Sequence, residues 1–218
     1  MLVLVFDTET NGFIKGDTGN LDDFPHIVQL SFILYDTISK EMIECCDFII
    51  NCEKKFKIPI ETTNIHGITE EISINQGVSI RTALQKFYDT LRKANYLVAH
   101  NIQFDDNMVQ IEFRRLGLDG QYLMSETNLN RLEQYCTMKN SKNLCKLPVK
   151  SKTGVLYYKN PKQSELHEYL FGTLPENLHN SLNDVLVCLR CFIKMKFTID
   201  VCDHNKKIKE MIFSKLNI

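Results

Sequence analysis

The chain has 218 residues, 44% of them hydrophobic and 24% charged, and its formal net charge is −1. This length suits one large domain or two small ones, and the composition is that of an ordinary globular protein. The near-neutral charge excludes a protein whose whole surface attracts polyanions, so only a local basic patch could do so. Neither a signal peptide nor an apolar run of about 18 residues is evident. We therefore expect an intracellular protein, cytoplasmic or nuclear, with reduced cysteines and no membrane contact.

The first predicted strand is the apolar run over 2–6, which leads directly into Asp7-Thr8-Glu9. An uninterrupted run of this kind is typical of a strand buried on both faces. Because side chains alternate along a strand, Asp7 and Glu9 point the same way and repel each other. A divalent cation would remove that cost, but a strand that simply surfaces into a polar turn explains the pair equally well.

Further strands and helices follow in an order that defines the fold class. Strands are expected over 26–35, 41–50, 96–99 and 133–138, and helices over 79–94, 103–116, 162–171, 181–197 and from 205 onward. Only a short turn joins the second and third strands, so they must be antiparallel, whereas the later strands alternate with helices. We therefore predict an α/β fold, a mixed sheet with helices on both faces. The segment 58–76 is expected to be irregular, and Ser79 is a candidate N-cap.

No linker, internal repeat or low-complexity tract divides the chain, so we expect a single domain over 1–218. Residues 139–162 nevertheless differ in composition, with seven lysines and no acid. We expect a basic loop or extended excursion, and we hypothesise that Lys146, Lys150 and Lys152 contact substrate phosphates. A solvated lysine-rich loop accounts for the composition equally well.

Two adjacent acids begin the predicted helix after the fourth strand, and helix phase distinguishes them. Asp105 shares its face with the apolar Val109 and Phe113, whereas Asp106 lies on the polar face with Arg114. An acid at the head of an apolar stripe needs a partner, so Asp105 is the better candidate for a site. A helix-start acid that complements the helix dipole is the structural alternative.

The last long helix repeats this arrangement, because Asp184 heads an apolar stripe and His179 stands five residues before it. The spacing of Ser181 and Asp184 also fits a capping box, which needs no ligand. Each acid alone has such an explanation, but three core-facing acidic sites at strand and helix ends would be costly as separate accidents. Gathered at one edge of the sheet they would form a four-carboxylate site, which suits Mg²⁺ or Mn²⁺.

Three motifs resemble, in order and spacing, those of the DnaQ-like (DEDDh) group of 3′–5′ exonucleases. They are Phe-Asp-Thr-Glu-Thr at 6–10, His-Asn-x-x-Phe-Asp at 100–105 and His-x4-Asp at 179–184. The Ile-His-Gly-Ile-Thr segment at 65–69 resembles a loop found between the first two motifs of that family. The resemblance extends over about 1–197, which would leave 198–218 as a helical tail.

The resemblance implies a ribonuclease-H-like fold with a central five-stranded sheet. It implies that two divalent cations are held by Asp7, Glu9, Asp105 and Asp184, and that His179 is the general base. It also places five residues near the 3′-terminal nucleotide: Thr8, Thr10, Asn11, His66 and Asn101.

The expected activity is hydrolysis of single-stranded or frayed DNA from the 3′ end, releasing nucleoside 5′-monophosphates in proofreading or repair, with a DNA polymerase as a possible partner. Two alternatives remain at this point. One is a 3′–5′ exoribonuclease, because the same site hydrolyses either backbone. The other is a catalytically silent nucleic-acid-binding or polymerase-associated module, against which the presence of all four acids and the histidine weighs.

A second metal site is conceivable near the C-terminus, where four residues have zinc-like spacing: Cys188, Cys191, Cys202 and His204. The first two cysteines lie on the core stripe of the predicted helix over 181–197, so we expect them to be apolar packing residues instead.

Overall fold

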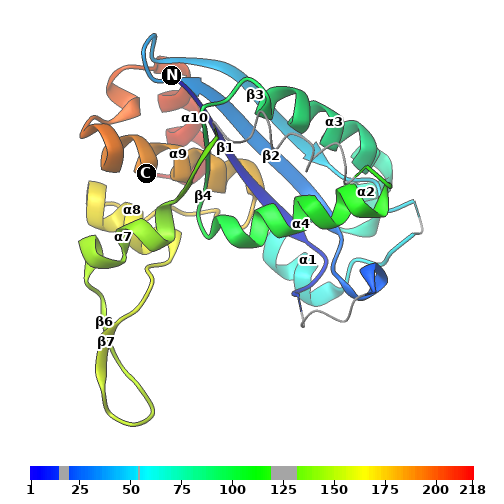
Figure 1. The fold of residues 1–218 in the computed structure, drawn as a ribbon, viewed down its shortest axis with the longest axis horizontal. Coiled ribbons are helices and arrows are strands. Elements are labelled where there is room, and N and C mark those ends of the chain that lie inside the picture. Colours follow the sequence, from blue (N-terminus) through cyan, green and yellow to red (C-terminus); the bar gives the residue numbers. More distant parts are fainter. Residues whose placement is uncertain (15–19, 54, 119–131) are drawn as a thin grey trace.

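The computed structural model describes residues 1–14, 20–53, 55–118 and 132–218, and a five-stranded sheet forms its centre (Figure 1). The strands lie in the order β3-β2-β1-β4-β5. Their bounds are β1 Leu2–Thr10, β2 Ile27–Asp36, β3 Glu41–Ile49, β4 Tyr96–Ala99 and β5 Glu133–Cys136. β2 is antiparallel to both β1 and β3, whereas β4 is parallel to both β1 and β5. The predicted α/β class with a mixed sheet is therefore confirmed.

β1 is central because its apolar residues are buried on both faces of the sheet. Val3 and Val5 pack into one core cluster, and Leu4 and Phe6 pack into the other. All four side chains are fully buried. This two-sided burial is the reason for an uninterrupted apolar run, since a half-exposed strand would alternate polar and apolar residues.

Helices cover both faces, as predicted. α3 (Ile80–Leu91) and α4 (Ile102–Arg115) supply the cluster that contains Leu4. α9 (Ser181–Phe197) and α10 (Lys206–Leu216) supply the opposite cluster. Figure 1 shows the two helix pairs on either side of the sheet. The sheet is thus the middle of three layers.

Several predicted element ends are confirmed by local hydrogen bonds and dihedral angles. The Ser79 side chain accepts from the Thr82 backbone N–H and caps α3. Gly172, at φ 71°, ends α8 (Gln163–Phe171) in the left-handed conformation that glycine favours. β4 and α9 have the bounds expected from sequence.

The expectation of irregular structure over 58–76 is wrong. The structure contains two helices there, α1 (Ile60–His66) and α2 (Glu70–Gln76), separated by Gly67 at φ 76°. Each has only seven residues, too few for a 3.6-residue hydrophobic period to become visible. The Thr69 side chain accepts from the Ile72 backbone N–H and begins α2, a capping signal that sequence reasoning overlooked.

The basic excursion over 139–162 is more regular than expected. β5 ends at Cys136, and the following helix α7 (Thr137–Cys145) contains the first lysines of this stretch. A separate antiparallel hairpin follows, made of β6 (Pro148–Lys150) and β7 (Leu156–Tyr158), and it projects away from the other elements (Figure 1).

Two short 3₁₀ helices complete the described elements, η1 (Leu21–Asp23) before β2 and η2 (Val201–Asp203) before α10. Among the helices in the described ranges, none combines the length and the apolar character required to cross a bilayer.

Candidate active site

A cleft of about 580 Å³ lies where β1 and the parallel strand β4 end. Parallel strands bring their carboxyl ends to the same edge of a sheet, and the first turns of α4 and α9 open there. The cleft is lined by the four predicted acids Asp7, Glu9, Asp105 and Asp184, together with His179. Three separate segments of the chain thus meet at one edge.

Three of these acids lie close enough to share a cation. Asp7, Glu9 and Asp184 each offer one carboxylate oxygen, and these oxygens lie within 4.8 Å of one another. Asp7 and Glu9 point the same way along β1, as strand alternation predicts. Oxygen donors alone suit a hard divalent cation.

Asp105 lies beside this group and is held by β1. Its Oδ1 accepts from the Thr8 backbone N–H at 3.0 Å and from Thr8 Oγ1 at 2.8 Å. Asp105 is buried, whereas Asp106 bonds to Gln110 on the outer side of α4. The structure therefore places the two acids as helix phase predicted, and Asp105 keeps Oδ2 for another partner.

The pKa values of all four carboxylates are raised above their usual range. Burial raises the pKa of Asp7 to about 7. Burial and then the charge of Asp7 raise the pKa of Glu9 to about 8. The same two causes, in the same order, raise the pKa values of Asp105 and Asp184 well above the usual range. Four acids this close cannot all be ionised near neutral pH without a compensating cation.

Ser181 connects α9 directly to the central strand. Its Oγ donates to the Asp7 backbone oxygen at 2.6 Å, and its backbone N–H donates to Gln29 Oε1 at 3.1 Å. The proposed capping box of Ser181 is therefore wrong, because Asn180 is the N-cap and accepts from the Asn183 backbone N–H. Ser181 instead fixes the start of α9, and with it Asp184, against β1.

Gln163 is a site residue that sequence reasoning missed. Its Nε2 donates to the Asp184 backbone oxygen at 2.8 Å and to Asp184 Oδ1 at 3.1 Å. The other carboxylate oxygen, Oδ2, accepts from the His179 backbone N–H at 2.8 Å. Both oxygens of Asp184 are thus oriented. No sequence signal marks Gln163, because only the fold brings the start of α8 to α9.

His179 stands in a left-handed conformation, φ 68°, on the loop before α9, and its side chain is exposed. It lines both the acidic cleft and an adjoining hollow that contains His66. His66 is buried; its Nδ1 accepts from the Ile68 backbone N–H at 3.0 Å, and burial lowers its pKa. Its buried Nε2 has no hydrogen-bond partner within the described part of the chain. Because Nδ1 accepts a hydrogen bond, the neutral ring carries its proton on Nε2. The Nε2–H group is therefore an unused donor beside the cleft.

The other predicted substrate residues divide into two groups. Thr8 and Asn101 line the cleft, Asn101 with an unusual φ of 72° and an exposed side chain. Thr10 and Asn11 do not line it. Thr10 Oγ1 donates to the Gly12 backbone oxygen, and the Asn11 amide bridges the backbones of two distant loops, accepting from His26 N and donating to Lys57 O.

His100 is the second residue whose placement the sequence did not indicate. Its Nε2 bonds to the Pro161 backbone oxygen at 3.1 Å and its Nδ1 to Thr137 Oγ1 at 3.0 Å. Burial lowers the pKa of His100 to about 4, so the ring is neutral near pH 7. Because a carbonyl only accepts, Nε2 carries the proton and donates it to Pro161. His100 therefore fastens residues 160–162 to the end of β4.

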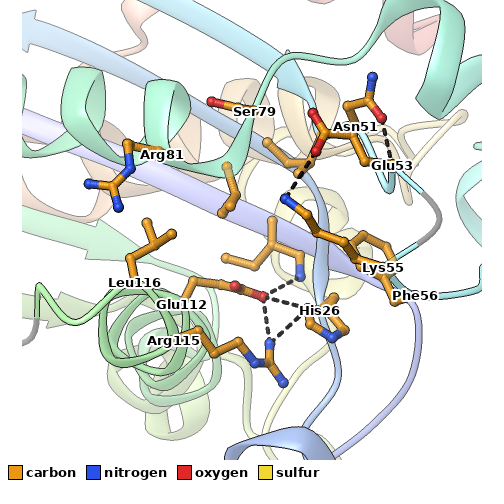
Figure 2. Close-up of a pocket in the computed structure, with 13 residues that line it drawn as sticks. His26, Asn51, Glu53, Lys55, Phe56, Ser79, Arg81, Glu112, Arg115 and Leu116 are labelled. Atoms are coloured by element: carbon orange, nitrogen blue, oxygen red, sulfur yellow. Dashed lines mark hydrogen bonds and ion pairs between the residues drawn. The ribbon is translucent and has the colours of Figure 1, made fainter.

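A second cavity, of about 440 Å³, lies near the start of α3, apart from the cleft that contains Asp7 and Asp184 (Figure 2). Buried Glu112 accepts from Arg115, which also donates to the backbone oxygens of Leu21, Phe24 and Pro25. The ring of His26 stacks on Phe56 at 4.3 Å. These contacts hold the loop before β2 against α4.

The zinc-like spacing near the C-terminus does not bring three or more of Cys188, Cys191, Cys202 and His204 together as potential ligands in the described residues. Within the described ranges, Asp7, Glu9 and Asp184 are the one cluster of three or more potential ligands. Cys188 and Cys191 are buried in the core beside β1, as the apolar interpretation expects.

A family model described as an exonuclease, of the RNase T type, matches residues 4–192. No curated protein sequence matches the chain. Among solved structures, one of exonuclease I has a TM-score of 0.68 at 16% identity, covering 98% of this chain and 43% of that chain. E. coli exonuclease I in complex with a dT13 oligonucleotide carrying a 5cy label gives 0.66 at 15% identity, with coverages of 98% and 43%. The zinc-bound E. coli exonuclease I–ssDNA complex gives 0.66 at 16% identity, with coverages of 93% and 42%.

The chain thus spans less than half of the length of these exonuclease I chains. At such identities the likeness concerns the fold, and it confirms the predicted ribonuclease-H-like architecture.

Proposed function

The chain belongs to the RNase T exonuclease family, and we propose that it is a metal-dependent 3′–5′ exonuclease that hydrolyses single-stranded or frayed DNA in proofreading or repair. The observation that carries the proposal is the set of three carboxylate oxygens within 4.8 Å at one edge of the sheet. Their partial burial and raised pKa values make the site costly without a cation.

Asp7, Glu9, Asp105 and Asp184 would hold two divalent cations, Mg²⁺ or Mn²⁺. When bound, such ions stabilise the attacking and leaving oxygens of an in-line phosphoryl displacement. The chain itself contributes rigidity. Thr8 fixes Asp105, Gln163 fixes Asp184, and Ser181 fixes the separation of α9 from β1. Loss of such an outer partner commonly lowers activity or metal affinity 10–100-fold.

His179 would act as general base and accept the proton of the attacking water. Its backbone N–H is anchored on Asp184 Oδ2 while its ring is exposed beside the cleft. Histidine is the side chain most often used for such proton transfer. Attack of water on the terminal phosphodiester breaks its bond to the preceding 3′ oxygen and releases a nucleoside 5′-monophosphate.

The residues around the acids would receive the 3′-terminal nucleotide. Asn101 offers an exposed amide and His66 an unused buried Nε2–H. Thr8 lines the cleft. We propose that Thr10 and Asn11 act through the shape of their turn, because their side chains are bonded to neighbouring backbone groups.

Single-stranded DNA is the preferred substrate class in this proposal, since the similar E. coli exonuclease I structures are described as complexes with oligonucleotides and ssDNA. A DNA polymerase is a possible partner. An exoribonuclease remains an outcome of the test, because a two-metal site hydrolyses either backbone.

A cleavage assay tests the proposal. Single-stranded DNA, duplex DNA and RNA, each labelled at the 5′ end, are incubated with Mg²⁺, Mn²⁺ or EDTA. We expect a metal-dependent ladder that shortens DNA from the 3′ end. Asp7→Asn should reduce the rate by more than the roughly 100-fold typical of losing an outer-shell partner. Asp106→Asn, on the outer side of α4 and not among the residues that line the cleft, is the matched control and should cleave like the wild type.

Cleavage of RNA alone would reassign the substrate. No cleavage of any substrate, with binding retained, would favour the silent nucleic-acid-binding module.

A further inference from the structure

The β6–β7 hairpin exposes apolar and aromatic side chains in a part of the molecule that builds no core. Leu156 is 66% exposed, Tyr157 52% and Tyr158 44%. Figure 1 shows the hairpin extending away from the sheet and its helices. An isolated two-stranded ribbon is marginally stable by itself, and exposed aromatic clusters usually mark an interaction surface.

The strand register places these residues with lysine. Lys150 lies opposite Leu156, and Val149 lies opposite Tyr157. Opposed residues share a face, and neighbours along a strand alternate, so Lys150, Leu156 and Tyr158 lie on one face and Tyr157 lies on the other. Each face of the hairpin therefore presents a tyrosine, and one face pairs it with a cation.

The charge of the surrounding segment is of one sign. Residues 139–162 contain seven lysines and no acid. Lys159 is paired with Glu165 at the base of the hairpin. The other six have no ion-pair partner in the part of the chain that the structure describes: Lys139, Lys142, Lys146, Lys150, Lys152 and Lys162. A local positive surface is thus present on a chain with a net charge of −1.

The hairpin is continuous with the wall of the acidic cleft. The Lys159 backbone N–H donates to the Leu147 oxygen at 3.0 Å and closes the base. The next four residues, 160–163, line the cleft. His100 holds Pro161 from one side, and Gln163 bonds to Asp184 from the other. A nucleic-acid strand that left the cleft along residues 160–163 would approach the base of the hairpin.

We propose that the β6–β7 hairpin, residues 147–159, is a second binding site for single-stranded nucleic acid. The tyrosines stack on bases and the lysines bind phosphates of the strand that trails from the cleft. This proposal rests on the proposed function for the direction of the strand. From its base to its tip the hairpin rises about 20 Å, at about 3.3 Å per residue. That reach corresponds to roughly six stacked nucleotides at about 3.4 Å each.

Nucleic acid fits this surface better than a protein partner does. Aromatic rings interleaved with cations and no acids are the combination used to bind single strands without sequence preference. The centre of a protein interface is instead depleted of lysine. The hairpin would therefore lengthen the footprint on the substrate without adding sequence specificity.

Binding in EDTA tests the proposal without requiring catalysis. The probes are oligothymidylates of about 20 and about three nucleotides, with a fluorescent 5′ label, and the readout is fluorescence anisotropy. Tyr157→Ala/Tyr158→Ala should weaken binding of the long probe about tenfold or more, the loss expected when base stacking is removed. Binding of the short probe, which reaches only the cleft, should not change.

A second pair of variants tests the charges. Lys150→Gln/Lys152→Gln should weaken binding of the long probe and flatten its salt dependence, by about 0.7 in logarithmic slope for each lost phosphate contact. Lys206→Gln/Lys207→Gln on α10 removes the same charge at exposed positions away from the cleft and should have little effect. Tyr169→Ala, an equally exposed tyrosine on α8, is the control for the aromatic pair.

Equal losses for both probes, or no loss for the long one, would overturn the proposal. A self-association that disappears in Leu156→Lys, measured by sedimentation with unchanged oligonucleotide binding, would assign the hairpin to protein contact instead. The outcome is separable from the cleavage assay. If no substrate is cleaved but the length-dependent loss is present, the proposed function fails and the second site remains.

Discussion

The carboxylate of Asp184 is oriented at both of its oxygens by groups that are far apart in sequence. Gln163 Nε2 reaches Oδ1 at 3.1 Å, and the His179 backbone N–H reaches Oδ2 at 2.8 Å. Gln163 is buried and also bonds to the Asp184 backbone oxygen. We infer that Gln163 is a positioning residue, which would hold the acid in the geometry needed for a cation.

Gln163→Ala should therefore lower metal affinity or activity by about 10–100-fold, the usual cost of losing an outer-shell partner. The measurement is cleavage rate as a function of Mn²⁺ concentration. A rightward shift of this curve distinguishes positioning from simple destabilisation, which would lower the plateau together with the melting temperature. Gln103→Ala, an exposed glutamine on α4, is the control. An unshifted curve in Gln163→Ala would contradict the role.

The raised pKa values of Asp7 and Glu9 predict how stability depends on pH. In the unfolded chain both acids ionise near pH 4, whereas in the metal-free folded protein they hold protons up to pH values of about 7 and about 8. Between these limits the folded state binds more protons, so the free energy of unfolding falls as pH rises. The melting temperature in EDTA should fall between about pH 5 and pH 8.5.

Divalent cation should reverse this trend, because it binds the ionised carboxylates and displaces their protons. The rise in melting temperature on adding Mn²⁺ should be larger at about pH 8.5 than at about pH 5. Asp7→Asn/Glu9→Gln removes both titrating groups, so its melting temperature in EDTA should depend less on pH. A wild type and a double variant with parallel pH profiles would show that the acids do not carry the effect.

Among the elements, α2 is held in place by a close approach of backbones at its end. Gly77 N donates to the Ser73 oxygen, and the adjoining Val78 oxygen accepts from Asn51 N. A Cβ at position 77 would lie 2.2 Å from the Ser73 oxygen and 2.6 Å from Asn51 N. Both neighbours are backbone atoms, so the helix end or the strand extension would have to move.

Gly77→Ala should consequently destabilise the protein by about 1–3 kcal/mol, the range typical of overpacking. Urea denaturation followed by circular dichroism provides the measurement. Gly12→Ala is the matched control, since its Cβ would meet only Pro25 Cβ at 3.8 Å, an ordinary contact. Equal stability of the two variants would mean that α2 is not packed as the structure indicates.

Which elements could be predicted from the sequence depended on their length and pattern. The seventeen residues of α9 carry several turns of apolar periodicity, and β4 is a four-residue apolar segment before a polar turn, so the sequence predicts both at their observed bounds. α1 and α2 were missed because seven residues show no clear period. The β6–β7 hairpin was missed because its outward-facing side chains follow no buried face.

At the scale of the whole molecule, the sequence predicts those residues of the site that belong to the three motifs, in their order along the chain. Helix phase selects Asp105 over Asp106, and the structure buries Asp105 in the cleft. The family assigned from three motifs is confirmed over residues 4–192. Gln163 and His100 could not be assigned their contacts, because these contacts exist only once α8 and the excursion fold back on the sheet.

The C-terminal segment 198–218 lies beyond the family match, yet it completes the core on one face of the sheet. Ile208, Ile212 and Leu216 on α10 are fully buried in the cluster that contains Val3 and Val5 of β1. We propose that this segment belongs to the same folding unit as the strand that carries Asp7.

The free energy contributed by burying the apolar side chains of this segment can be compared with the net stability of a typical domain. Burying an isoleucine or leucine side chain contributes about 1.5–3 kcal/mol, so three of them contribute a sum comparable to the net stability of about 5–15 kcal/mol of a typical domain. Ile212→Ala should therefore cost about 2–5 kcal/mol in urea denaturation, as a single cooperative transition. Phe213→Ala, at the adjacent position and 45% exposed, should cost far less.

If α10 were an independent appendage, Ile212→Ala would leave the main transition unchanged and add a separate early one. If the segment belongs to the core, the same variant should lower the temperature at which cleavage activity is lost, because the sheet edge that holds the acids unfolds together with α10.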